Sequence, residues 1–283
     1  MKYVILNHGT NNPNYESDVK AFEATIGACR EEDVDGLDYV AFLKGLQPSD
    51  EVYLMGGDGT LNWFINGLGD YEPTLPVYLY PAGTGNDFIH DVLGQVERKP
   101  VLINEYIKNL PVVEVTQAGN EGSKICKKFI NGIGYGIDGY CCEMGDKLKE
   151  EGKKVDYTAI AIKGLLFHFK KVTATVSVDG KQERFQDVWL APSMKGRFYG
   201  GGMMVAPAQD RADEALSLVV FRGKSKLHTL MVFPSIFKGE HVKHEKMVFV
   251  RRGKEIEVSF DRPTALQIDG ETVLNVTSYR VKA

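Results

Sequence analysis

The sequence predicts an α/β domain with a parallel sheet, followed by a β-rich domain of sandwich-like architecture. Strand and helix signals alternate over the first third of the 283 residues, as in parallel sheets with crossover helices. Two of the strands in this part end in glycine-rich loops. Beyond about Pro111, strand signals and Asp-Gly turns dominate instead. We therefore expect domains at 1–110 and 111–283, with the last strands free to return to the first domain.

The elements of the first domain follow from the spacing of its apolar residues. Residues 2–7 read as a buried strand, and residues 16–31 carry apolar side chains at helical spacing. A second strand over 50–55 ends in a glycine loop that leads into a helix. A third strand over 77–80 repeats this layout and is followed by a short helix over 88–93. Because strands alternate with helices, we expect the strands to run parallel.

The second domain is predicted to be antiparallel, with one helix over 155–169. Its turn signals are Asp179-Gly180, Arg252-Gly253 and Asp269-Gly270. The expected strands cover residues 112–116, 127–131, 172–178, 187–191, 215–221, 247–251, 256–260 and 265–268.

Composition indicates a folded, cytoplasmic protein. Hydrophobic residues make up 43% and charged residues 25% of the chain, and no apolar run approaches the roughly 18 residues of a membrane span. The N-terminal segment lacks the pattern of a secretory signal. Cys29, Cys126, Cys141 and Cys142 show no CxxC spacing, so we expect reduced thiols. His241 and His244 stand among lysines, which favours a solvated basic surface over a zinc site.

Positive charge is concentrated in one segment of the chain. Residues 222–254 contain nine Lys or Arg and two Glu, although the whole chain has a net charge of −4. Such a segment fits transient binding to an anionic membrane surface, which would place the protein peripherally on the inner face of a membrane. A solvated surface on a β-rich domain would give the same composition. We expect no nucleic-acid partner, and the sequence leaves a homodimer open.

The glycine loops carry the clearest chemical signal. Gly56, Gly57 and Gly59 follow a strand, where the absence of a Cβ lets backbone N–H groups approach phosphate oxygens. Asp58 lies among these glycines, and an acidic residue can meet phosphates only through a bridging cation or ordered water, which suggests Mg²⁺-nucleotide rather than a bare anion. A second loop, 83–87, follows the next strand at the same edge of the sheet, where ligands of α/β proteins bind. Two tight strand-to-helix turns are the structural alternative.

These loops resemble those of the diacylglycerol kinase catalytic family, which includes sphingosine and ceramide kinases and soluble bacterial lipid kinases. NAD kinases share the first loop. The resemblance implies a two-domain lipid kinase/NAD kinase-like fold, ATP in the interdomain cleft, Mg²⁺, and transfer of the γ-phosphoryl group to a lipid hydroxyl. The segments that carry it read Gly56-Gly57-Asp58-Gly59-Thr60-Leu61-Asn62, Pro81-Ala82-Gly83-Thr84-Gly85-Asn86-Asp87-Phe88, Asn131-Gly132-Ile133-Gly134-Tyr135-Gly136-Ile137-Asp138, Tyr199-Gly200-Gly201-Gly202-Met203 with Ala206-Pro207, and Asp269-Gly270-Glu271.

The resemblance also assigns site residues. Glu271 would accept the proton of the lipid hydroxyl, with Asp58 as the second catalytic residue; the structural alternative for Glu271 is an acid on a surface turn. A further Mg²⁺ site would be built from Asp210, Asp213 and Ala215, although an Asp213-Glu214 step replaces the usual Asp-Gly. Acidic turns without metal are common. The nucleotide would contact Asn7, Gly56, Gly57, Asp58, Gly59, Thr60, Leu61, Asn62, Thr84, Asn86 and Asp87.

The leading hypothesis is therefore an ATP- and Mg²⁺-dependent lipid kinase whose substrate is diacylglycerol or a related lipid alcohol. An NAD kinase is the alternative enzyme, and a catalytically silent nucleotide- or lipid-binding homologue is a third interpretation. The apolar helix over 155–169 could wall an acyl-chain channel or simply pack on the β-rich domain. The apolar residues between 227 and 237 could likewise meet a bilayer or fill a core.

Overall fold

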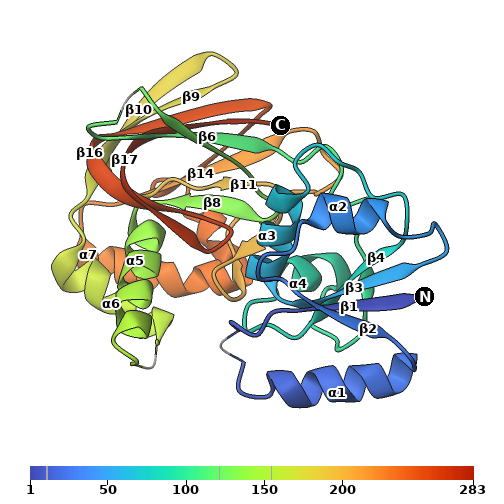
Figure 1. The fold of residues 1–283 in the computed structure, drawn as a ribbon. Coiled ribbons are helices and arrows are strands. Elements are labelled where there is room, and N and C mark those ends of the chain that lie inside the picture. The colour runs from blue at the N-terminus through green and yellow to red at the C-terminus, as the bar shows by residue number, and fades with distance from the viewer. Residues whose placement is uncertain (11, 121, 154) are drawn as a thin grey trace. The chain divides into compact units, whose positions relative to one another are not determined.

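The computed structural model describes residues 1–10, 12–120, 122–153 and 155–283. It divides into two compact units, Met1–Leu110 and Pro111–Ala283, most of whose elements are labelled in Figure 1. The first unit is an α/β domain with a largely parallel sheet, and the second is rich in antiparallel strands. The predicted fold class is confirmed.

The first unit contains one sheet with the strand order β2-β1-β3-β4-β5. The first four of these strands run parallel, and β5 pairs antiparallel with β4. The strands are β1 (Lys2–Leu6), β2 (Arg30–Asp33), β3 (Glu51–Gly56), β4 (Val77–Pro81) and β5 (Val101–Leu102). The helices are α1 (Tyr15–Ile26), α2 (Tyr39–Lys44), α3 (Asp58–Gly67) and α4 (Asp87–Leu93).

Burial explains the apolar runs of this sheet. Val4, Val52 and Leu54 are fully buried, because the inner parallel strands are covered on both faces. The predicted helix over 16–31 is too long. Helix α1 ends at Ile26, since Gly27 adopts a left-handed φ of 77°, and the chain then pairs along β1 as strand β2.

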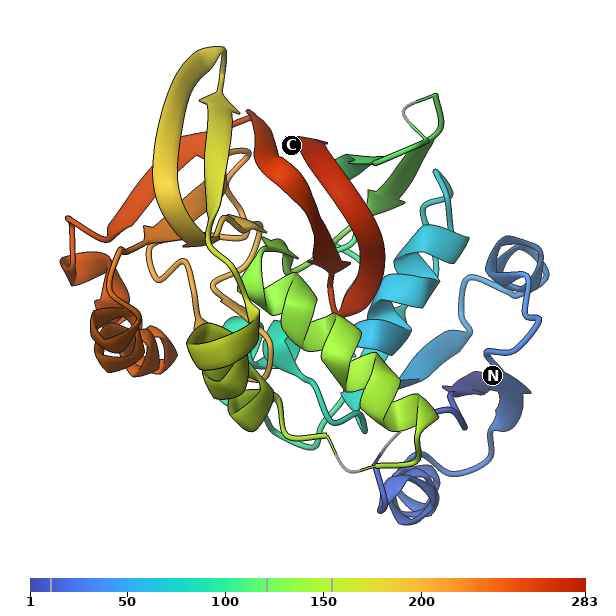
Figure 2. The same cartoon turned by 90° about the vertical axis from the view of Figure 1, so that its left-hand side faces the viewer.

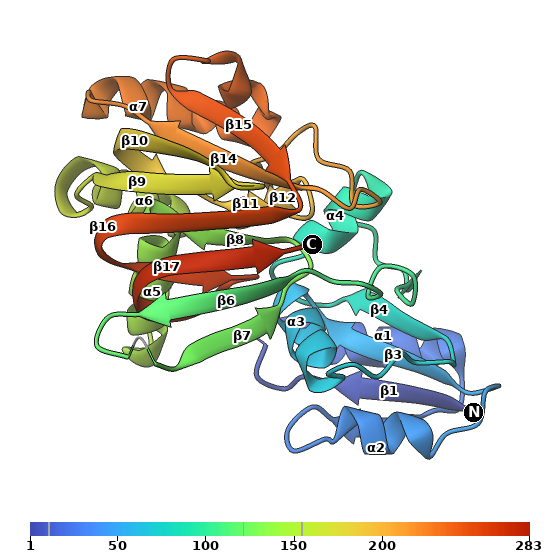
Figure 3. The same ribbon diagram turned by 90° about the horizontal axis from the view of Figure 1, so that it is seen from above.

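The second unit is built on one large antiparallel sheet, seen from above in Figure 3. Strand β9 pairs with both β10 and β16, so the strands from β16 through β8, β11, β14 and β10 to β9 close into a ring. The strands are β6 (Val112–Gln117), β7 (Lys124–Lys128), β8 (Gly132–Tyr135), β9 (Val172–Val178), β10 (Lys181–Leu190), β11 (Ser193–Met194), β14 (Leu216–Arg222), β15 (Val248–Gly253), β16 (Glu255–Ile268) and β17 (Glu271–Lys282). A separate small pair joins β12 (Phe198–Tyr199) to β13 (Met203–Met204).

The last two strands pair inside this second unit. Strand β17 lies between β6 and β16. Strand β16 is one long, irregular strand whose pairing register shifts between Ser259 and Leu266. The two strands predicted over 256–260 and 265–268 are therefore halves of a single element.

Helices and helical turns cover this sheet. They are α5 (Ile137–Glu150), α6 (Tyr157–Lys163), the π-helix η1 (Gly164–His168), α7 (Lys226–Val232) and the 3₁₀ helices η2 (Phe233–Lys238) and η3 (Glu240–Lys243). The predicted helix over 155–169 corresponds to α6 continued by η1. Figure 2 shows the green helix α5, which the sequence did not predict, crossing in front of the red strands β16 and β17. Among the described residues, no helix has both the length and the apolar character needed to span a bilayer.

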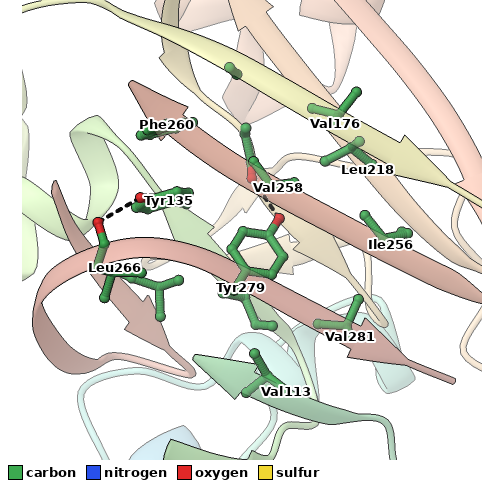
Figure 4. Packing of buried hydrophobic residues seen from close by; sticks show 14 of the residues in the cluster. Val113, Tyr135, Val176, Leu218, Ile256, Val258, Phe260, Leu266, Tyr279 and Val281 are labelled. Atoms are coloured by element: carbon green, nitrogen blue, oxygen red, sulfur yellow. Dashed lines mark hydrogen bonds between the residues drawn. The ribbon is translucent and has the colours of Figure 1, made fainter. Parts of the chain in front are cut away.

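Aromatic residues organise the core of the second unit (Figure 4). The rings of Tyr135 and Phe260 stack with their centroids 3.7 Å apart. The buried hydroxyls also find partners, because Tyr135 donates to the carbonyl oxygen of Val276 (2.7 Å) and Tyr279 donates to that of Ala191 (2.8 Å). These bonds fix β8 and β17 to their neighbours without leaving a polar group unsatisfied.

One histidine departs from the expected basic surface. His241 is buried, and its Nε2 lies 2.9 Å from the carbonyl oxygen of Val205. Burial lowers its pKa to about 4, so the ring is neutral at physiological pH. The prediction of a solvated surface was therefore wrong for His241, which is the buried residue of η3.

Candidate functional site

The two glycine loops of the first unit lie against each other. One connects β3 to α3, and the other connects β4 to α4; because β3 and β4 are parallel neighbours, both loops leave the same edge of the sheet. Two backbone hydrogen bonds join them. The N–H of Asp58 donates to the carbonyl oxygen of Gly85 (3.0 Å), and that of Ala82 donates to the carbonyl oxygen of Gly56 (3.1 Å).

The glycines of these loops serve two different purposes. A Cβ on Gly57 would lie 2.1 Å from the carbonyl oxygen of Gly85, and one on Gly83 would lie 2.5 Å from Gly57 Cα. These two glycines are therefore required by the packing of one loop on the other. Gly59 is different, because a Cβ there would have no described atom within 4 Å. The open space beside Gly59 leaves room for a ligand at the start of helix α3.

Asp58 ties the second loop to the first. Its carboxylate oxygens accept the backbone N–H groups of Asp87 (2.8 Å) and Phe88 (2.9 Å), which open helix α4. Asp58 is only 9% exposed. A carboxylate at a helix N-terminus satisfies N–H groups that have no partner inside the helix and interacts favourably with the helix dipole. The sequence predicted a catalytic role for Asp58, and the structure shows that its carboxylate holds the two loops together.

The remaining predicted residues of the first loop differ in accessibility. Asn7 at the end of β1 donates from Nδ2 to Thr60 Oγ1 (2.8 Å), so it braces the first turn of α3. Asn62 is 1% exposed and Leu61 is fully buried. These two buried side chains lie beneath the loop. The backbone N–H groups of Gly59 and Thr60 belong to the first turn of α3, and they precede Leu61, whose N–H donates to the carbonyl oxygen of Gly57 (3.0 Å).

The predicted residues of the second loop stand at its outer surface and its base. Thr84 is exposed. Asn86 donates from Nδ2 to the carbonyl oxygen of Gly83 (2.9 Å), while its buried Oδ1 has no hydrogen-bond partner among the described residues. Asp87 is 5% exposed and opens α4. The loop thus presents the Thr84 hydroxyl at its surface, whereas the Asn86 amide oxygen is buried.

The Asp-Gly-Glu turn of the second unit has an anchoring carboxylate. Asp269 and Gly270 both have positive φ, 46° and 96°, as a tight turn between β16 and β17 requires. Asp269 accepts the backbone N–H groups of Ile130 (2.7 Å), Asn131 (2.9 Å) and Gly132 (2.9 Å). This carboxylate therefore connects the turn to the segment that leads into β8.

Glu271, the predicted catalytic base, follows this turn as the first residue of β17. Its carboxylate forms an ion pair with Lys127 of β7, and the two side chains are 26% and 35% exposed. The carboxylate is thus accessible and faces a cation. Lys127 was not predicted, because it lies on a strand that neighbours β17 only through β6.

A buried acid in the second unit also escaped prediction as a site. Asp138 opens helix α5, and its Oδ2 accepts a hydrogen bond from the Tyr199 hydroxyl, while its Oδ1 has no hydrogen-bond partner among the described residues. Burial raises the pKa of Asp138 to about 6, opposed by the hydrogen bonds from Tyr199 and the helix N-terminus. Its only sequence signal was its place at the end of the 131–138 segment.

Comparison with protein families decides the identity of the chain. Residues 21–118 match the model of the diacylglycerol kinase catalytic domain, and residues 131–281 match that of the YegS C-terminal NAD kinase beta sandwich-like domain. The chain belongs to the diacylglycerol kinase catalytic family. The second match lies within the second unit, and the first match covers most of the first unit and continues to residue 118 in the second.

Individual members of the family are distant in sequence. The diacylglycerol kinase of Mycobacterium tuberculosis is 26% identical over 215 residues, which cover 74% of this chain and 67% of that protein. The diacylglycerol kinase of Staphylococcus carnosus is 27% identical over 238 residues, which cover 81% of this chain and 72% of that protein.

Solved structures agree with the fold. A structure of a diacylglycerol kinase from Bacillus anthracis has a TM-score of 0.62 at 17% identity, covering 99% of this chain and 92% of that one. A yeast NADH kinase complexed with NADH has a TM-score of 0.51 at 11% identity, covering 100% of this chain and 80% of that one. At these identities the likeness concerns the fold alone.

The loop over 207–215, where the resemblance placed a further Mg²⁺, does not fit a cation. The Asp213 carboxylate is paired with Arg252, and the Glu214 carboxylate is paired with Lys254. No group of three or more His, Cys, Asp or Glu side chains is placed to hold a metal ion in the part of the chain that the structure describes. Of the expected ligands, the Asp213 carboxylate is thus paired with an arginine of this chain.

Proposed function

We propose that this protein is an ATP- and Mg²⁺-dependent lipid kinase that phosphorylates the hydroxyl group of diacylglycerol or a related lipid alcohol. The observation that carries the proposal is the pair of bonded glycine loops, with open space beside Gly59, in a member of this kinase family. The names of the relatives support a lipid acceptor.

In this proposal the first unit holds the nucleotide. The first-turn N–H groups of Gly59 and Thr60 have the orientation and dipole that favour an anion, so phosphate oxygens would lie beside Gly59. Thr84 and Asn86 would add polar contacts from the second loop. Mg²⁺ would enter with the nucleotide, near the carboxylates of Asp58 and Asp87, and would neutralise the charge that develops on the triphosphate.

The second unit supplies the base. As the lipid hydroxyl oxygen forms its bond to the γ-phosphorus, the bond to the ADP oxygen breaks and the hydroxyl proton passes to Glu271. Lys127 holds the Glu271 carboxylate in place before the substrate arrives. ADP leaves with the electron pair of the broken bond, so the reaction balances without any further reactant.

The second unit also supplies a candidate membrane surface, which we define as Ile162, Phe167, Leu227, Met231 and Phe237. These apolar side chains are 44% to 73% exposed, and they come from α6, η1, α7 and η2. Lys226 Nζ donates to the carbonyl oxygen of Leu166 (2.6 Å), which joins α7 to η1. The exposed lysines of these segments (Lys163, Lys170, Lys224, Lys226 and Lys238) would complement anionic lipid headgroups.

A transfer assay tests the proposal. The purified protein would be given γ-³²P-ATP and Mg²⁺ with, in turn, diacylglycerol, sphingosine, ceramide, phosphatidylglycerol and NAD. We expect label in a lipid product. Label in NAD alone would replace the proposal by an NAD kinase, and ATP binding without any labelled product would indicate a silent nucleotide-binding homologue.

A further inference from the structure

The connection between Ala206 and β14 contains three carboxylates. Residues 207–215 include Asp210, Asp213 and Glu214. A cation in such a loop would be held by carbonyl oxygens as well as carboxylates, since hard cations prefer several oxygen ligands. The partners of those carbonyl oxygens therefore decide whether the loop has room for a metal.

The side chain of Gln209 forms hydrogen bonds with two of the carbonyl oxygens. Its Nε2 donates to the carbonyl oxygens of Asp210 (2.8 Å) and Ala215 (3.0 Å). Its Oε1 accepts the hydroxyl of Ser217 (2.6 Å). Gln209 is 4% exposed and Ser217 is 2% exposed. Because carbonyl oxygens only accept hydrogen bonds, the amide orientation is fixed, and both of its N–H groups are used.

A lysine forms a hydrogen bond with the third carbonyl oxygen. Lys195 follows β11, and its Nζ donates to the carbonyl oxygen of Asp213 (2.8 Å). Burial and the nearby Arg211 lower the pKa of this ammonium group, whereas Asp213, Asp210 and Glu214 act in the opposite direction. The ammonium thus lies within the field of all three carboxylates of the loop, where a metal cation would otherwise neutralise them.

The carboxylates of the loop also have partners within this chain. Asp213 pairs with Arg252, and Glu214 pairs with Lys254, both from the far end of β15 and the turn that follows it. Asp210 Oδ1 accepts the N–H of Ala212 (2.9 Å). Arg211 donates to the carbonyl oxygen of Ile130 (2.6 Å), so it leaves the loop and braces the segment before β8.

We propose that the Lys195 ammonium and the Gln209 amide take the place of a divalent cation in this loop, which therefore folds without metal. The Lys195 charge and the two Gln209 N–H groups satisfy the carbonyl oxygens of Asp210, Asp213 and Ala215. A divalent cation would have to displace these donors and would be repelled by the ammonium. In this proposal, the Lys195 ammonium group takes the place of the metal ion that the resemblance predicted at these three residues.

Metal binding and thermal unfolding test the proposal without nucleotide, so the outcome does not depend on kinase activity. Binding of Mn²⁺ would be followed by electron paramagnetic resonance, and the melting temperature would be measured in EDTA, in MgCl₂, in CaCl₂ and in NaCl of equal ionic strength. For the natural sequence we expect no bound Mn²⁺ and the same melting temperature in all four. One bound Mn²⁺ that Asp213→Asn abolishes would overturn the proposal, even if every other variant failed to fold.

The variant Lys195→Met removes the ammonium and keeps the aliphatic stem. Lys181→Met, at an exposed position on β10, is the matched control. We expect Lys195→Met to melt several degrees lower than the control in EDTA, and Mg²⁺ or Ca²⁺ to restore part of the difference. An equal melting temperature for the two variants, or a loss that neither cation reduces, would overturn the proposal.

Discussion

The carboxylate of Asp58 accepts the backbone N–H of Asp87, a residue 29 positions later in the chain, at 2.8 Å. The bond joins the first residue of α3 to the first residue of α4. An acid that the sequence assigned to ligand chemistry is therefore also the link between the two loops that would bind the ligand. Changes at Asp58 should affect stability as well as turnover.

Replacing Asp58 by Ala should destabilise the protein. The change leaves the N–H groups of Asp87 and Phe88 without their acceptors, and loss of a helix cap costs about 0.5–2 kcal/mol. Asp58→Asn keeps one oxygen acceptor and should lose less. Urea unfolding would measure both, with the exposed Asp35→Ala as control. An unfolding midpoint for Asp58→Ala equal to that of the control would contradict the capping role.

Two glycine substitutions should separate packing from ligand binding. Gly57→Ala should lower the melting temperature strongly, because the new Cβ would meet the carbonyl oxygen of Gly85 at 2.1 Å. Gly59→Ala meets no described atom within 4 Å and should keep or slightly raise the melting temperature. It should nevertheless weaken ATP binding by tenfold or more, measured by calorimetry. Unchanged ATP affinity in Gly59→Ala would place the phosphates elsewhere.

Glu271→Gln should reduce kcat by roughly 10²- to 10⁴-fold, the range typical of a general base. The ATP Kd should barely change. Because Glu271 and Lys127 are both partly exposed, loss of their ion pair should alter the melting temperature little. Lys127→Met removes the pair and keeps the base, so its kcat should fall much less than that of Glu271→Gln, and the exposed Glu257→Gln is the neutral control. An unchanged kcat in Glu271→Gln would remove Glu271 from the reaction.

The buried Asp138 should make stability depend on pH. Because burial raises its pKa to about 6, the folded state binds the proton more tightly than the unfolded chain. The contribution of protonated Asp138 to the stability of the folded state is complete below the ordinary pKa near 4. This contribution is lost as the pH rises toward 6. Asp138→Asn stays neutral at every pH. Between pH 4 and pH 7 the natural sequence should therefore lose about 2 kcal/mol of unfolding free energy relative to this variant.

Urea unfolding of the two proteins at both pH values measures this shift. The comparison cancels the opposite dependence that buried His241 introduces, since its pKa is lowered to about 4 in both. A difference between the two proteins that does not vary with pH would show that Asp138 has an ordinary pKa in the folded state.

The membrane surface predicts a binding defect without a folding defect. The combined change Phe167→Ser, Leu227→Ser and Met231→Ser removes three largely exposed apolar side chains. Partition onto vesicles of phosphatidylglycerol and phosphatidylcholine should fall by roughly 100-fold or more. Val96→Ser, half exposed in the first unit, is the control. Equal vesicle binding by the triple variant and this control would show that another surface meets the membrane.

Sequence patterns were sufficient to predict the elements that are marked by the spacing of nearby apolar residues and glycines. The strands β3 and β4 and their glycine loops follow from apolar runs that end in Gly, and the structure places them side by side. Helix α5 was missed because glycines occupy part of its buried face. A Cβ at Gly139 would lie 2.0 Å from the carbonyl oxygen of Ala265, and one at Gly145 would lie 2.7 Å from the Tyr157 ring. Small residues that permit close packing leave no apolar periodicity to detect.

Local sequence patterns could not identify the partners of the candidate site residues. Lys127 meets Glu271 across 144 residues, and Lys195 meets the carbonyl oxygen of Asp213 because β11 and β14 are paired. The loop over 207–215 shows the difficulty most clearly, since its acidic residues resemble a cation site in sequence. Whether such a loop binds a cation depends on which side chains from the neighbouring strands contact its carbonyl and carboxylate oxygens.

The position of β17 between β6 and β16 governs how this chain can fold during synthesis. The first unit makes all its strand pairs within its own 110 residues and can fold while translation continues. In the second unit, β6 can pair with β7 early but must wait for residues 276–282 to gain its second partner, and the amides of 130–132 must wait for Asp269. A ribosome that stops before β17 thus releases a finished α/β domain joined to strands with open edges, which are substrates for chaperones and proteases.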